Sequence, residues 1–211
     1  MNAGKQTRIF VSLIVFALLT SCLPAQSAFE ERRERWDNER QPPGRVMDAV
    51  GVKPGLVIGE VGAGRGRYTV YLAERVGQTG KVYAEDIDRE SLDYLRDRVK
   101  KAGLSNVEAI LGEVDDPLFP KGSVDIVFFV LSYHHLADPV TLLKNLIPCL
   151  KPGAVLAVID PDSTKDPGSR ASEYTSREKI ESEAGEAGFE LVRVETFLAK
   201  DNLFILRVKT A

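Results

Sequence analysis

Three glycines at alternate positions are the first feature of this sequence that can support chemistry. Gly62, Gly64 and Gly66 follow an apolar run that carries one acid, Glu60, in the segment VIGEVGAGRGRYT. Because glycines have no side chains, a flat or extended ligand can lie against the backbone of such a loop. A dinucleotide-binding fingerprint needs its third glycine where this chain has Arg67. A carboxylate as near as Glu60 also repels a pyrophosphate, so the loop is predicted to bind a cationic ligand without phosphate.

Acidic residues also end the next two predicted strands. In VYAEDID, Asp86 falls beside the glycine loop, where a carboxylate can accept both hydroxyls of a ribose, and Glu85 or Asp88 can substitute for it. In ILGEVDD, Glu113 can meet the amine of a base while the backbone N–H of Val114 meets a ring nitrogen. The carboxyl ends of parallel strands meet at one edge of a sheet. These residues are therefore predicted to form one ligand site, with a solvated acidic turn as the alternative for the acids of VYAEDID.

The two histidines of the chain stand together in LSYHHLADP, directly after the fourth predicted strand. A histidine with an ordinary pKa of about 6.5 can deprotonate a bound acceptor, so His134 and His135 are both candidate general bases. The alternative is that one histidine packs under the sheet and the other lines the pocket. A metal site is not expected, because adjacent residues of a turn need not point the same way and no third histidine is available.

Strand-like and helix-like segments alternate along the chain and must position these residues. Strands are expected over residues 56–61, 81–86, 107–111, 124–131, 154–160, 189–198 and 202–208. Helices are expected over residues 68–76, 89–102, 139–150 and 176–187. This order predicts an α/β fold, a three-layer sandwich with a mostly parallel, seven-stranded Rossmann-like sheet and one antiparallel strand near the C-terminus.

Five segments together resemble a known family. EVGAGRG, AEDID, GEVDD, SVDIVFF and LKPGAVLAVID match, in order, the motifs of class I S-adenosylmethionine-dependent methyltransferases of the small-molecule type, often grouped with ubiquinone-biosynthesis-like enzymes. The resemblance runs from about position 44 to the end of the chain. It implies S-adenosylmethionine (SAM) as cofactor and a small-molecule methyl acceptor. The cofactor-binding residues it implies are Glu60, Gly62, Ala63, Gly64, Gly66, Asp86, Glu113 and Val114. Glu113 replaces the aspartate more usual at the adenine position.

The N-terminal residues have the composition of a secretory leader. Lys5 and Arg8 precede an apolar run over residues 9–19, which is shorter than the roughly 20 residues that a spanning helix needs. Export to the periplasm or attachment to a membrane is therefore predicted. The segment LTSC resembles a lipobox, in which Cys22 would be lipidated; an ordinary cleavage near residues 25–28 is the alternative, and a retained leader would act as an anchor. Cys149 is predicted to be a buried packing residue.

The predicted organisation is a leader over residues 1–27, a charged arm over residues 28–43 and a methyltransferase domain over residues 44–211. The net charge of −3, from 28 basic and 31 acidic side chains, gives no reason to expect nucleic acid as a partner. A non-catalytic adenosyl-ligand-binding or envelope interaction protein on the same scaffold is the alternative function. An NAD-dependent oxidoreductase ranks third, because Arg67 occupies the position of the third glycine.

Overall fold

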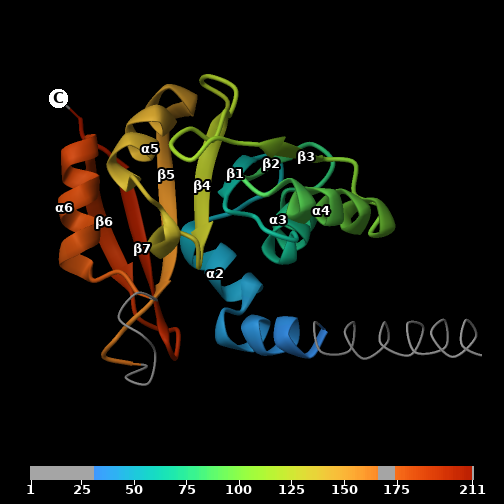
Figure 1. The fold of residues 1–211 in the computed structure, drawn as a ribbon, viewed down its shortest axis with the longest axis horizontal. Helices are drawn as coiled ribbons and strands as arrows, with labels where there is room; N and C mark the ends of the chain where they lie inside the picture. Colours follow the sequence, from blue (N-terminus) through green and yellow to red (C-terminus); the bar gives the residue numbers. More distant parts are fainter. Residues whose placement is uncertain (1–30, 166–173, 211) are drawn as a thin grey trace, which may run out of the picture. The chain divides into compact units, whose positions relative to one another are not determined.

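The computed structural model describes residues 31–165 and 174–210 (Figure 1). The predicted leader and Cys22 lie outside these residues. Residues 31–40, within the predicted charged arm, form a helix, in which Arg33 lies 3.9 Å from Asp37 one turn later. Residues from Arg40 onward form one compact unit. Within the described ranges, no helix is long and apolar enough to span a membrane.

A seven-stranded sheet in the order β3-β2-β1-β4-β5-β7-β6 forms the centre of this unit. Its strands are β1 (Val57–Val61), β2 (Lys81–Asp86), β3 (Val107–Leu111), β4 (Val124–Val130), β5 (Leu150–Pro161), β6 (Phe189–Glu195) and β7 (Asp201–Val208). β7 runs antiparallel to both of its neighbours, and all other pairs are parallel. The predicted fold class, with one antiparallel strand near the C-terminus, is confirmed.

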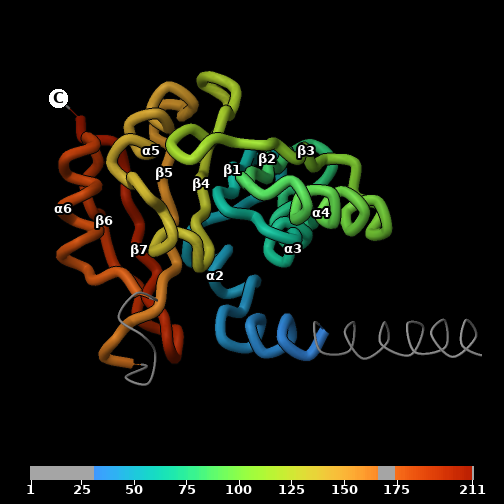
Figure 2. Tube along the Cα trace, viewed as in Figure 1, coloured from blue at the N-terminus to red at the C-terminus, as the bar shows by residue number. Residues whose placement is uncertain are grey.

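Helices cover both faces of the sheet (Figures 1 and 2). They are α2 (Pro43–Val50), α3 (Arg67–Val76), α4 (Arg89–Lys101), α5 (Pro139–Leu146) and α6 (Arg177–Ala187), with 3-10 turns η1 (Tyr133–His135) and η2 (Ile147–Cys149). Successive side chains of β4 point to opposite faces. Phe128 therefore shares a core with Leu72 of α3, whereas Phe129 shares a second core with Leu143 of α5.

Three predicted boundaries are wrong. The strand expected over residues 189–198 ends at Glu195. β5 begins at Leu150 instead of residue 154, and the helix expected over residues 139–150 ends at Leu146. Pro148 explains the early end, since proline has no N–H to donate within a helix and its ring clashes with the preceding turn. Leu150 then pairs with Val124 of β4, ahead of a register shift. Cys149 is 5% exposed, as predicted for a packing residue.

Candidate active site at the carboxyl edge of the sheet

The glycine loop connects β1 to α3 and has a backbone that few other residues can adopt. Gly62, Gly64 and Gly66 all have positive φ, of 71°, 54° and 75°. A Cβ at Gly62 would lie 2.5 Å from the Cβ of Ser132, so the loop packs tightly against the segment after β4. A Cβ at Gly64 would meet no atom within 4 Å. The loop therefore packs closely against Ser132 at Gly62, whereas it has free space beside Gly64.

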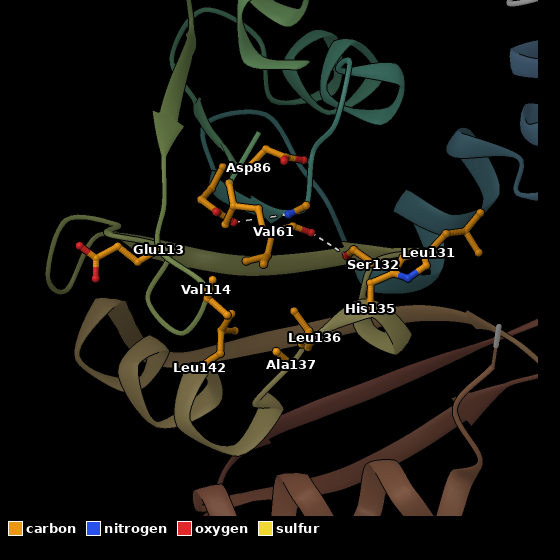
Figure 3. A pocket seen from close by; sticks show the side chains of 13 residues that line it. Val61, Asp86, Glu113, Val114, Leu131, Ser132, His135, Leu136, Ala137 and Leu142 are labelled. Atoms are coloured by element: carbon orange, nitrogen blue, oxygen red, sulfur yellow. Dashed lines mark hydrogen bonds between the residues drawn. The ribbon is translucent and has the colours of Figure 1, made fainter. Parts of the chain in front are cut away.

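A cavity of about 430 Å³ lies at the carboxyl edge of the sheet. Its walls are Val61, Gly62, Glu85, Asp86, Ile87, Glu113, Val114, Leu131, Ser132, His135, Leu136, Ala137 and Leu142. Figure 3 shows Asp86 and Val61 on one side of it and Val114, Leu136 and Leu142 on the opposite side. The structure therefore brings the ends of β1, β2 and β3 together with the segment after β4, as the sequence predicted.

The three acids at the end of β2 have different surroundings. Asp86 accepts the N–H of Gly64 at 2.7 Å and that of Asp88 at 2.8 Å, and it lines the cavity. Asp88 accepts the hydroxyl of Ser91 and caps α4 by accepting the N–H groups of Glu90 and Ser91, and these bonds hold the pKa of its carboxyl below the usual value. Asp88 is therefore occupied by the helix. Asp86 lines the cavity and accepts a short hydrogen bond from the glycine loop, which supports its choice as the ribose ligand.

Glu85 is the acid whose surroundings sequence reasoning did not foresee. Its side chain is 2% exposed and yet lines the cavity. Burial raises the pKa of its carboxyl to about 8, helped by repulsion from Asp86 and Asp116. The sequence feature that could have indicated this was an acidic residue inside a strand that is otherwise apolar and is buried on both faces of the sheet.

Several predicted cofactor residues lie beside the cavity and are not part of its walls. Glu60 is 2% exposed and accepts the hydroxyl of Thr69 at 2.6 Å; its burial raises its pKa to about 7. Ala63 donates its N–H to the carbonyl of Glu85 at 2.8 Å. Gly66 caps α3 in a left-handed conformation. These residues shape the loop, and their contact with a cofactor stays a prediction.

The two histidines have different surroundings. Nδ1 of His134 lies 2.7 Å from Oδ1 of Asp160, and the two side chains are 7% and 0% exposed. His135 is exposed and lines the cavity, with its ring centroid 4.0 Å from that of His134. An Nδ1–H that donates to Asp160 leaves Nε2 of His134 as an acceptor. Sequence reasoning missed Asp160, whose side-chain environment only the pairing of β4 with β5 reveals.

A buried polar cluster joins the N-terminal end of the compact unit to α3. Arg40 donates to both carboxylate oxygens of Asp201, at 2.8 and 2.6 Å, and Gln41 donates to the same group at 3.1 Å. Arg67 donates to the side-chain oxygen of Gln41 at 2.8 Å. The residue in the third-glycine position is thus tied to the start of β7. No short-range sequence pattern indicated this link.

Comparisons with known proteins agree with this geometry. A family model described as a methyltransferase domain matches residues 58–153. The crystal structure of a SAM-dependent methyltransferase from Aquifex aeolicus is 32% identical in sequence, with a TM-score of 0.74 over 79% of this chain and 89% of its own. The chain belongs to the SAM-dependent methyltransferases. The non-catalytic alternative gains no support from these relatives.

Curated relatives of this methyltransferase match over a shorter range. The demethylmenaquinone methyltransferase of Listeria welshimeri is 32% identical over 123 residues, 58% of this chain and 52% of the relative. That of Geobacillus stearothermophilus is 33% identical over 115 residues, 54% of this chain and 49% of the relative. The chain spans about half the length of these curated relatives.

The walls of the cavity fit the cofactor that the family implies. Asp86 can hold the ribose, Glu113 and the backbone of Val114 can meet the adenine, and the aliphatic walls suit a flat base. Among the described residues that line the cavity, none is a lysine or arginine. A cavity with the acidic side chains of Asp86, Glu113 and the buried Glu85, and with no lysine or arginine in its described walls, suits a sulfonium ligand and disfavours a pyrophosphate.

Proposed function

We propose that this methyltransferase transfers a methyl group from SAM to a small-molecule acceptor. The observation that carries the proposal is the acid-lined cavity at the carboxyl edge of the sheet, which adjoins the glycine loop. When bound, SAM supplies the electrophilic methyl group on its sulfonium. The protein aligns the acceptor with that methyl group and excludes water, because the reaction is an in-line displacement.

Calorimetry of the chain without its leader tests which cofactor the protein binds. We expect binding of SAM and S-adenosylhomocysteine (SAH) and much weaker binding of NAD. Asp86→Ala should weaken SAH binding by about 10–100-fold, because charge-assisted hydrogen bonds to the ribose are lost. Asp93→Ala is the matched control, since Asp93 contacts Arg96 on the surface of α4 and does not line the cavity. Preferential binding of NAD would overturn the proposal.

For the acceptor, we propose a molecule of the demethylmenaquinone type as the first class to assay. The support is that the matched curated relatives are demethylmenaquinone methyltransferases. The assay follows SAH formation together with a product one methyl group heavier. Turnover with this or another acceptor from a metabolite screen would also exclude the non-catalytic alternative, because a binding protein produces no SAH.

We propose His134 as the general base and assign His135 to the wall of the cavity. The support is the contact of His134 with buried Asp160, which fixes the ring and leaves Nε2 to accept a proton. His134→Ala should lower kcat by about 10²–10⁴-fold with little change in SAH affinity. Asp160→Asn should lower kcat as well, whereas His135→Ala should mainly raise KM. A larger loss of kcat in His135→Ala would reverse the assignment.

We propose that the leader directs the protein to the periplasm or holds it at a membrane. The support is the basic start, the short apolar run and Cys22 directly after it. Because SAM is made in the cytosol, a retained leader that faces the cytoplasm is one arrangement compatible with activity. Mass spectrometry of the native N-terminus decides between an acylated Cys22, an unlipidated start near residues 27–29 and an intact Met1. Stable anchoring by lipid needs two or more acyl chains, which an acylated Cys22 would carry. If Cys22 is acylated, Cys22→Ser should therefore shift the protein from the membrane fraction to the soluble fraction or leave the precursor uncut.

A further inference from the structure

Glu85 stands where the sheet places apolar side chains. Its register partners are Val61 of β1 and Ile110 of β3, and on the same face of β2 the side chain of Tyr83 is buried. A strand covered on both faces normally carries apolar residues at such positions. A carboxyl group at this depth costs free energy unless it finds a hydrogen-bond partner. Residues that break a local rule in this way concentrate at functional sites.

The protein itself satisfies the Glu85 carboxyl poorly. The one hydrogen bond to it within the described residues is from the N–H of Gly62, at a long 3.4 Å. The charged and titratable groups around the cavity are Asp86 on β2, Glu113 and Asp116 after β3, and His135 after β4. Burial and the repulsion from Asp86 and Asp116 raise the pKa of Glu85 to about 8. At neutral pH the group is mostly an uncharged acid with an O–H to donate.

Because Gly112 has no side chain, the Glu85 carboxyl can occupy the space beside it. A Cβ at Gly112 would overlap the side chain of Glu85, with Oε1 as its nearest atom. Gly112 directly precedes Glu113, the residue predicted to meet the adenine amine, and both Glu85 and Glu113 line the cavity. The carboxyl therefore packs against Gly112, next to the segment that is predicted to meet the adenine.

We propose that Glu85 is a specificity-determining residue that donates a hydrogen bond from its buried carboxyl to a ring nitrogen of the adenine of the bound cofactor. The inference rests on the proposed function and assigns a role to a residue that the sequence motif left as a substitute for Asp86. It also explains why a carboxyl group is buried at this position, because the ligand supplies the hydrogen-bond partner that the protein itself does not provide. A buried donor of this kind rejects a ligand without the matching acceptor.

Calorimetry with SAH tests the proposal in three variants. Glu85→Leu should weaken binding by about tenfold, because one hydrogen bond is lost. Glu85→Gln keeps a donor of similar size and should bind nearly as tightly as the native chain. Glu90→Gln is the control, since Glu90 is exposed on α4 and does not line the cavity. Urea denaturation of each variant verifies the fold.

Two further measurements are specific for the hydrogen bond. We compare three SAH analogues that carry carbon in place of N1, N3 or N7 of adenine. One of them should bind about tenfold more weakly than SAH to the native chain and equally well as SAH to Glu85→Leu. Binding of SAH should also weaken by about tenfold between pH 7 and pH 9 in the native chain, because a carboxylate cannot donate, and stay flat in Glu85→Gln.

The outcomes separate this inference from the proposed function. If the native chain fails to bind SAH, both the proposed function and the proposed role of Glu85 are overturned. If the native chain binds SAH, but Glu85→Leu binds equally well and none of the three analogues shows coupling to Glu85, the role of Glu85 is wrong and the proposed function stands.

Discussion

Replacing Gly62 by alanine should destabilise the fold more than the same change at Gly64. Both glycines have positive φ, and an alanine in this conformation costs about 1–2 kcal/mol. At Gly62 the new methyl group would also lie 2.5 Å from the Cβ of Ser132. Overpacking of this kind costs about 1–3 kcal/mol. We expect a loss in the free energy of unfolding of about 2–5 kcal/mol for Gly62→Ala and about 1–2 kcal/mol for Gly64→Ala.

Urea denaturation followed by circular dichroism measures these losses. Gly103→Ala is the control, since Gly103 has a φ of 68°, lies in the turn after α4, and would have no atom within 4 Å of an added Cβ. It should reproduce the conformational cost alone. In a Ser132→Gly background the crowding atom is gone, so Gly62→Ala should there cost only about 1–2 kcal/mol. Equal losses at Gly62 and Gly64, or a cost at Gly62 that Ser132→Gly does not reduce, would refute the packing argument.

Three further predictions concern other parts of the protein. Asp201→Ala should lower the free energy of unfolding by about 3–5 kcal/mol in urea denaturation, because the buried carboxylate that accepts from Arg40 and Gln41 is lost; a loss below about 1 kcal/mol would contradict this. Glu60 has a folded pKa of about 7 against an ordinary 4.5, so the folded state binds its proton more tightly and stability should fall as pH rises between these values. Glu60→Gln should remove that slope and be the more stable protein at pH 8 by on the order of 2 kcal/mol, and an unchanged slope would place the titration elsewhere. Leu143→Ala should cost about 2–5 kcal/mol, because the side chain is 1% exposed in the core beneath α5, and thermal denaturation should show this without a change in SAH affinity at low temperature.

The fold and the position of the candidate site were predictable from local patterns. Apolar runs bounded by glycine and proline specify the parallel strands, and the apolar spacing of Leu92, Leu95 and Val99 specifies α4. Because the sheet is parallel, acids at successive strand ends such as Asp86 and Glu113 must meet at one edge. Those two residues do line one cavity.

What sequence reasoning missed depends on contacts between distant segments. The partner of His134 is Asp160, at the far end of the next strand, and its identity depends on the register of β4 with β5. Gln41 and Asp201 are 160 positions apart, and no periodicity links them. The cluster of acids at the end of β2 was visible, but which member is buried, which lines the cavity and which caps a helix depends on the direction of each side chain. Pro148 was visible too, and its effect on the preceding helix was underestimated.

The crystal structure of the complex with SAH tests the central claim most directly. We expect SAH to lie in the cavity of about 430 Å³, with its ribose hydroxyls within hydrogen-bond distance of the Asp86 carboxylate and its adenine beside Val114. The homocysteine part should run along the open side of the glycine loop at Gly64. SAH bound at another place on the molecule, or in this cavity with its ribose turned away from Asp86, would contradict the claim.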